Sequence, residues 1–129
     1  MHENQIAKIA VDKAYHVHNE LGPGLLESAY QACLAYELRN AGLNVGQEVG
    51  LPVVYKEVEL DCGYRMDLWA NEKLIIEVKS IDALHDIHMA QILTYLKLAD
   101  NKLGLLINFN VKKIKDGIKR VINGNLEDY

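Results

Sequence analysis

The stretch "LIIEVKS", residues 74–80, decides the fold that we expect for this chain. Its aliphatic and β-branched residues suit a strand that is buried on both faces, which is typical of the centre of a sheet. Glu77 and Lys79 interrupt this apolar run. Because residues two apart on a strand share a face, the two charges are expected to project together. The stretch therefore predicts a central strand that carries either an ion pair or a functional site.

The segments around this strand predict a single α/β domain over residues 1–129. Apolar residues at helical spacing predict three helices, over residues 4–20, 25–40 and 83–99, with Asn4 capping the first. Alternating segments predict strands over residues 44–56, 56–71, 74–80 and 102–109, with interruptions near Pro52 and Gly63. A basic loop follows over residues 111–117, and residues 118–123 are expected to form a last strand or a helical turn. This order predicts a mixed sheet flanked by helices, in which a meander precedes a crossover through the third helix.

The composition agrees with an ordinary globular domain that does not cross a membrane. The chain has 129 residues, of which 50% are hydrophobic and 25% charged. No run of about 18 apolar residues predicts a transmembrane helix, and the N-terminus lacks the basic start and apolar core of a signal peptide. Cys33 and Cys62 show no metal-binding spacing, so we expect free thiols in a reducing cytoplasm.

A hairpin between residues 56–71 and 74–80 would bring a second carboxylate to the central strand. If the strands turn about Asn71–Glu72, Asp67 falls nearly opposite Glu77. Two adjacent carboxylates repel each other, and a hard divalent cation removes that penalty. The backbone carbonyl of Val78 is a further candidate ligand. We therefore expect a site for Mg²⁺ or Mn²⁺ here, although an ion pair between Glu77 and Lys79 at a strand end is the simpler interpretation of those two residues alone.

Strict alternation along "YRMDLWA", residues 64–70, predicts which side chains accompany Asp67. Tyr64, Met66 and Leu68 are expected on one face, and Asp67 and Trp69 on the other. For Tyr64 and Trp69, packing in the core is favoured over stacking on nucleobases.

Two helices carry further candidates for the same site. Glu27 and Tyr30 are three residues apart, so they share a helix face that is otherwise apolar, and Gln91 and Tyr95 are four apart on the third helix. Glu27 could instead be a first-turn glutamate favoured by the helix dipole, and the other pair a polar flank of an amphipathic helix. His85 and His88 have a spacing that permits zinc binding, but no third ligand is evident.

Positive charge gathers in the last third of the chain, although the net charge is −4. The overall charge argues against a basic protein that coats nucleic acid without specificity. The cluster itself is either a solvated rim or a contact surface for phosphates. Under the second interpretation, the nucleic-acid-binding residues are Lys112, Lys113, Lys115, Lys119 and Arg120.

Four segments in order resemble the small bacterial proteins of the GxxExxY family: "GPGLLESAY", "YRMDLWANEKLIIEVKS", "AQILTYLKL" and "GLLINFNVKKIKDGIKR". The resemblance runs from about Ile9 to Val121. That family is placed in the PD-(D/E)XK nuclease-like superfamily, so the resemblance implies a restriction-endonuclease-like fold.

The resemblance also implies roles for individual residues. Asp67 would be the metal-binding aspartate, Glu77 and Lys79 the (D/E)XK element, and Glu27 the acidic residue of the first core helix. Gln91 and Tyr95 would form the QxxxY motif of RecB-type members. All six would belong to the catalytic site.

These observations leave three functional hypotheses. The first is a metal-dependent nuclease that hydrolyses phosphodiester bonds of DNA or RNA, with DNA favoured. The second is a non-catalytic nucleic-acid-binding or accessory module that retains the fold, and the third is a hydrolase of another phosphate ester. Because the chain is small, we expect a homodimer or a protein partner if it acts on a duplex.

Overall fold

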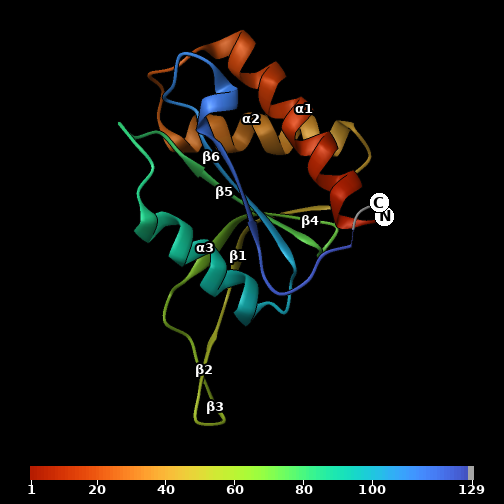
Figure 1. The fold of residues 1–129 in the computed structure, drawn as a ribbon, viewed down its shortest axis with the longest axis vertical. Helices are drawn as coiled ribbons and strands as arrows, with labels where there is room; N and C mark the ends of the chain where they lie inside the picture. The colour runs from red at the N-terminus through yellow and green to blue at the C-terminus, as the bar shows by residue number, and fades with distance from the viewer. Residues whose placement is uncertain (128–129) are drawn as a thin grey trace.

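Two helices, five strands, a third helix and two further strands separated by a 3₁₀ helix follow one another along residues 1–127, the part of the chain that the computed structural model describes (Figure 1). The helices are α1 (Glu3–Leu21), α2 (Glu27–Asn40), α3 (Asp86–Leu98) and the short 3₁₀ helix η1 (Ile114–Gly117). The strands are β1 (Val45–Gly50), β2 (Val53–Tyr55), β3 (Val58–Leu60), β4 (Arg65–Ala70), β5 (Leu74–Lys79), β6 (Leu103–Asn108) and β7 (Ile118–Ile122).

Five strands form one mixed sheet in the order β1-β4-β5-β6-β7. β5 lies at its centre, as its apolar sequence predicts, and pairs antiparallel with β4 and parallel with β6. The parallel pair is joined by α3, which is the predicted crossover. The fold class of an α/β protein with a mixed sheet flanked by helices is therefore confirmed.

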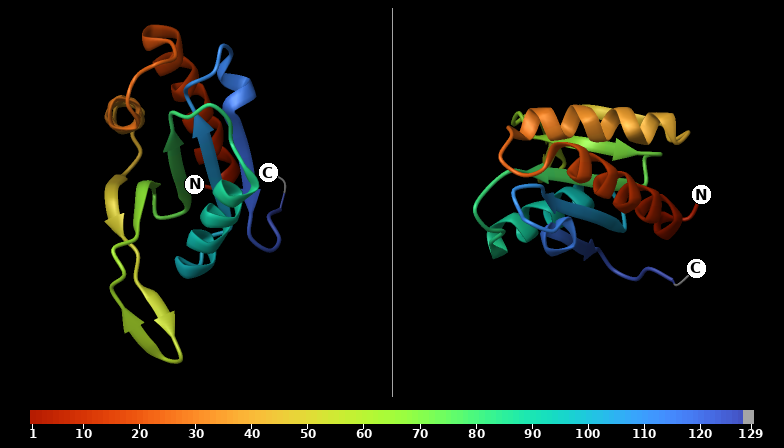
Figure 2. Two further views of the ribbon diagram at one scale, coloured as in Figure 1. Left: turned by 90° about the vertical axis from the view of Figure 1, so that its left-hand side faces the viewer. Right: turned by 90° about the horizontal axis from the view of Figure 1, so that it is seen from above.

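Helices cover both faces of this sheet (Figure 2). A hydrophobic core lies between the sheet and the helices on each face. The first core joins α1 and α2 to one face and includes Ile76 and Val78 of β5. The second joins α3 to the other face and includes Ile75. Neighbouring residues of β5 thus contribute to different cores, because side chains alternate along a strand. Burial on both faces explains why β5 has a nearly continuous apolar sequence.

Some boundaries differ from the prediction. α1 begins at Glu3 rather than Asn4, because His2 acts as the N-cap: its Nδ1 accepts the amide of Asn4 at 2.9 Å. The side chain of Gln5 accepts the amide of His2 in return, also at 2.9 Å, so two amides at the helix start are satisfied. α2 and α3 are shorter at their N-termini than predicted, and residues 118–122 resolve as a strand.

The β2–β3 hairpin projects from the body of the molecule as a separate two-stranded sheet (Figure 1). The predicted interruptions are confirmed, since residues 51–52 separate β1 from β2, and Gly63 lies in the turn before β4 with a φ of 79°. Val54 and Tyr55 are 61% and 60% exposed. The hairpin therefore contributes little to either core.

Among residues 1–127, no helix is both long and apolar enough to cross a membrane. Cys33 and Cys62 are free thiols, as expected.

The loop between α1 and α2 is held by the buried side chain of Tyr30. Its hydroxyl donates to the carbonyl of Gly22 at 2.6 Å and accepts the amide of Leu25 at 3.1 Å. Its ring stacks on that of Phe109, with centroids 4.6 Å apart, and neither residue is exposed. Tyr30 thus positions the start of α2, from which Glu27 projects.

We predict that Tyr30→Phe lowers the free energy of unfolding by about 1 kcal/mol, since two partly buried backbone groups lose a hydrogen-bond partner. Urea denaturation measures this change. Tyr36→Phe is the matched control, because Tyr36 lies on the same helix and is 65% exposed. Equal effects of the two substitutions would contradict the role given to Tyr30.

Candidate active site

β4 and β5 stop pairing where they approach the predicted site. We call this point, at Asp67 and Glu77, the fork. The two strands pair from Ala70–Leu74 as far as Leu68–Ile76, and no further pair follows. At the next position the amide of Asp67 donates to Oε2 of Glu77 at 2.8 Å. The amide of Val78 donates to Oδ2 of Asp67, also at 2.8 Å. Asp67 and Glu77 therefore lie side by side, as expected. Each carboxylate accepts a backbone amide that a carbonyl of the neighbouring strand would accept in a regular sheet.

The predicted alternation along β4 is wrong at this fork. Met66 packs in the core beneath α3, whereas Leu68 packs in the core beneath α1 and α2. The change coincides with Glu48 on the neighbouring strand, whose φ of 54° is left-handed and uncommon for glutamate.

Trp69 donates through Nε1 to Oδ1 of Asn101 at 2.8 Å and packs against the α3-side core, so its interpretation as a packing residue is correct. The same interpretation is wrong for Tyr64, which is 44% exposed and belongs to neither core.

The carboxylate pair lies in surroundings that disfavour two negative charges. Glu77 is 5% exposed. Its burial, followed by the charge of Asp67, raises the pKa of Glu77 to about 8, although the amide of Asp67 and the charge of Lys79 act in the opposite direction. Burial also raises the pKa of Asp67, against the effect of the Val78 amide. The metal-free pair therefore retains a proton near neutral pH.

On the α2 side, a cavity of about 250 Å³ borders Asp67 and is lined by further polar side chains. Gln31, 8% exposed, donates through Nε2 to Oε1 of Glu48 at 2.8 Å and to the backbone carbonyl of Asp67 at 3.2 Å. Oε1 of Glu27 accepts the amide of Ser80 at 3.4 Å. The predicted Glu27 is thus brought to the site.

Gln31 and Glu48 were not among the predicted site residues. Gln31 follows Glu27 by four residues, so their shared helix face was a usable signal. Glu48 offered no such signal, because its position beside Asp67 depends on the β1–β4 pairing and on its own left-handed backbone.

On the α3 side, Tyr95 lies within electrostatic reach of Glu77, and Gln91 precedes Tyr95 by one turn of the helix. Nε2 of Gln91 donates to the hydroxyl of Tyr95 at 3.1 Å. Burial, followed by the charge of Glu77, raises the pKa of Tyr95. Within residues 1–127 neither side chain hydrogen-bonds to Lys79, which is half-buried at the end of β5.

The two histidines of α3 have a structural role. The amide of His85 donates to Nδ1 of His88 at 2.9 Å, which closes a capping box at the helix start. Across the described chain, no group of three or more His, Cys, Asp or Glu side chains is close enough to hold a metal ion. The zinc interpretation therefore finds no support.

The basic residues of the C-terminal third divide into separate groups. Lys119 pairs opposite Leu106 and Arg120 opposite Leu105, and these two leucines belong to different cores. The two cations therefore lie on opposite faces of the sheet, and Arg120 donates to the side chain of Asn4. By contrast, Lys112 and Lys113 lie in the loop that follows β6, at the edge where Lys79 ends β5.

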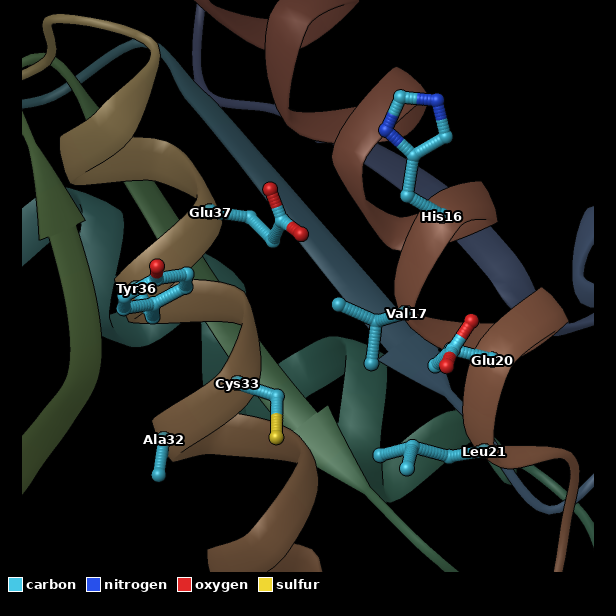
Figure 3. A pocket seen from close by; sticks show the side chains of 8 residues that line it. All are labelled: His16, Val17, Glu20, Leu21, Ala32, Cys33, Tyr36 and Glu37. Atoms are coloured by element: carbon cyan, nitrogen blue, oxygen red, sulfur yellow. The ribbon is translucent and has the colours of Figure 1, made fainter.

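A second cavity, of about 290 Å³, lies between α1 and α2 (Figure 3). Its lining comes from those two helices alone and includes Cys33 and Tyr36, but none of the predicted site residues. The carboxylates of the fork therefore belong to a separate region.

A family model for the PD-(D/E)XK nuclease superfamily matches residues 4–121. The chain belongs to this superfamily. The five-stranded mixed sheet with flanking helices agrees with the restriction-endonuclease-like fold of PD-(D/E)XK proteins. No curated protein and no solved structure matches the chain significantly.

PD-(D/E)XK nucleases generally use divalent metal ions, and the donors at the fork suit such an ion. Asp67 and Glu77 supply carboxylate oxygens, and Val78 offers a backbone carbonyl. Mg²⁺ is commonly held by one or two carboxylates together with water, so the small number of protein ligands is compatible with it. A cation would also relieve the repulsion that raises the pKa of Glu77.

We predict that Glu77 makes the stability of the metal-free protein fall as the pH rises from about 4.5 to about 8. Within this window the folded protein keeps a proton that the unfolded chain, with the ordinary pKa of 4.5, has released. The slope for one proton is at most about 1.4 kcal/mol per pH unit.

Glu77→Gln should flatten this slope, as measured by urea denaturation in EDTA across that range. Glu59→Gln, at an exposed position of β3, should leave it unchanged. A slope that persists in the Glu77 variant would contradict the assignment.

Proposed function

We propose that this PD-(D/E)XK protein, as a GxxExxY family member, is a Mg²⁺- or Mn²⁺-dependent nuclease that hydrolyses phosphodiester bonds of DNA or RNA. The observation that carries the proposal is the reciprocal bonding of Asp67 and Glu77 at the fork, with Lys79 two residues further along β5. Superfamily membership supports the general activity, and these residues supply the chemistry that it needs.

In this proposal Asp67, Glu77 and the carbonyl of Val78 hold the metal ion, while Glu27 binds it directly or through water. The ion supplies positive charge for the phosphate and lowers the pKa of a bound water. Lys79 positions the attacking water as an ammonium group, or deprotonates it as a neutral amine, since its flexible chain can bring either form to the water.

Gln91 and Tyr95 have a positioning role in the proposal. Their hydrogen bond orders both side chains on the α3 side of the candidate site. From there they orient Lys79 or a phosphate oxygen of the substrate.

We favour DNA as the substrate. Its backbone is guided by cations of the loop after β6 and of η1, which are Lys112, Lys113 and Lys115. Lys119 and Arg120 are more distant contacts. The first three follow β6 at the edge of the sheet where Lys79 lies. We expect a cytoplasmic protein that acts as a homodimer or with a protein partner.

Purified protein should cut single- or double-stranded DNA or RNA in Mn²⁺ or Mg²⁺, and EDTA should abolish the cleavage. Glu77→Gln and Lys79→Ala should each lower the rate by at least roughly 100-fold, the lower range for loss of a positioned acid–base group. Product formation on denaturing gels measures these rates.

The controls for cleavage are Glu59→Gln and Lys102→Ala, at exposed positions outside the fork. They should retain the rate of the unmodified protein. Cleavage that survives equally in the Glu77 and Lys79 variants would reveal a contaminating nuclease and contradict the proposal.

A non-catalytic nucleic-acid-binding module is the second candidate. Its support is the absence, within residues 1–127, of three ligating side chains close enough for a metal ion, together with the proton retained by the fork. Metal binding separates the two candidates.

Calorimetric titration with Mn²⁺ should show binding that strengthens as the pH rises toward about 8, because Glu77 must lose its proton to act as a ligand. Asp67→Asn and Glu77→Gln should each abolish this binding, whereas Glu59→Gln should not. If the unmodified protein binds no Mn²⁺ at any pH in this range, the accessory module is the correct assignment.

A further inference from the structure

A third cavity, of about 500 Å³, adjoins the candidate active site on its α3 side. Its walls include Val53 at the root of the β2–β3 hairpin, Tyr64 just before β4, and Ile87 and Leu98 of α3. Gln91 and Tyr95 also line it. The cavity therefore includes both α3 side chains of the candidate site.

An aromatic ring is held at the side of this cavity and is partly open to solvent. Tyr64 is 44% exposed, and its ring centroid lies 6.0 Å from that of Tyr95 at an interplanar angle of 60°. Such tilted pairs are favourable contacts between aromatic rings, so Tyr95 orients the ring of Tyr64. Across the cavity, Ile87 is 71% exposed. The cavity thus presents oriented apolar surface to solvent.

The chemistry of the lining suits a flat, uncharged group. Among the described residues that line the cavity, none is Lys, Arg, Asp or Glu, so no permanently charged side chain there favours phosphate; the lining also includes His88, whose Nδ1 accepts the amide of His85. Gln91 donates to Tyr95, and within residues 1–127 its Oε1 accepts no hydrogen bond, which leaves an acceptor for a ligand's N–H group. A cavity of this size falls within the range of small-molecule sites, roughly 300–1,000 Å³.

We propose that this cavity binds one unpaired nucleobase, stacked on Tyr64, so that the protein recognises single-stranded nucleic acid. Bases stack on aromatic side chains with little regard to sequence, and a base in an intact duplex has both faces and its pairing edge occupied. Tyr95 lines this cavity and lies within electrostatic reach of Glu77, so the backbone of the bound nucleotide would run on the side of the candidate active site. That the bound strand is also cut at this point rests on the proposed function; binding of the base does not.

Binding is tested by fluorescence anisotropy in EDTA, where metal-dependent cleavage cannot occur. Three labelled probes are compared: a short oligothymidine, an abasic strand of equal length and a duplex whose ends are closed by hairpin loops of abasic residues. The unmodified protein should prefer the oligothymidine. Tyr64→Ala should weaken its binding by roughly 5- to 100-fold, the range for loss of one stacking aromatic, and should leave the other two probes unaffected.

Three further variants control for folding. Tyr64→Phe keeps the ring and should keep the affinity, and Ile87→Ala, at an exposed side chain, should reproduce a smaller selective loss. Tyr36→Ala, at an exposed tyrosine of the α1–α2 cavity, should have no effect. The proposal is overturned if the unmodified protein does not prefer oligothymidine. It is also overturned if Tyr64→Ala leaves the affinity for oligothymidine unchanged, or lowers the affinity for the abasic strand by the same factor.

These outcomes are independent of hydrolysis. Selective binding without cleavage in Mn²⁺ would support the base site and contradict the nuclease. If Tyr64→Ala cuts single strands as fast as the unmodified protein does, the result would support the nuclease and contradict the base site.

Discussion

Two backbone amides in the middle of the sheet donate to carboxylates instead of to backbone carbonyls. The rest of the candidate site depends on this replacement of the hydrogen-bond acceptors. Asp67 accepts from Val78, and Glu77 accepts from Asp67. Glu77 is buried and Asp67 half-buried. Burial of a carboxylate is costly unless it is hydrogen-bonded, and these two bonds offset part of that cost. They also separate β4 from β5, since no ladder pair follows Leu68–Ile76. The fork is thus both a local exception in the fold and the origin of the site's chemistry.

Most of the architecture could be predicted from the sequence because its signals are local. The apolar run of β5 indicated a strand buried on both faces, and the predicted turn at Asn71–Glu72 set the register that places Asp67 beside Glu77. The helix starts were less accurate. His2, an uncommon N-cap, precedes the more conventional Asn4, and only the reciprocal bond with Gln5 shows which residue caps the helix.

The parts of the site that could not be predicted depend on long-range pairing and on unusual backbone. Glu48 reaches the site because β1 pairs with β4 and because the φ of Glu48 is positive. The periodicity of the sequence predicts neither property. The same limitation applies to the basic cluster. Lys119 and Arg120 are adjacent in sequence, yet a strand directs adjacent side chains to opposite faces. Closely spaced basic residues in the sequence therefore suggested a larger single basic surface than the fold forms.

The two cores on opposite faces of the sheet divide the site between them. Glu27 and Gln31 arrive with the α1–α2 layer and Gln91 and Tyr95 with α3, while Asp67, Glu77 and Lys79 belong to the sheet itself. Local opening of one layer is a lower-energy event than global unfolding in most domains. Detachment of the helical layer at one face would remove two of these side chains from the candidate site. The candidate site therefore depends on both helical layers staying in place, and not on the sheet alone.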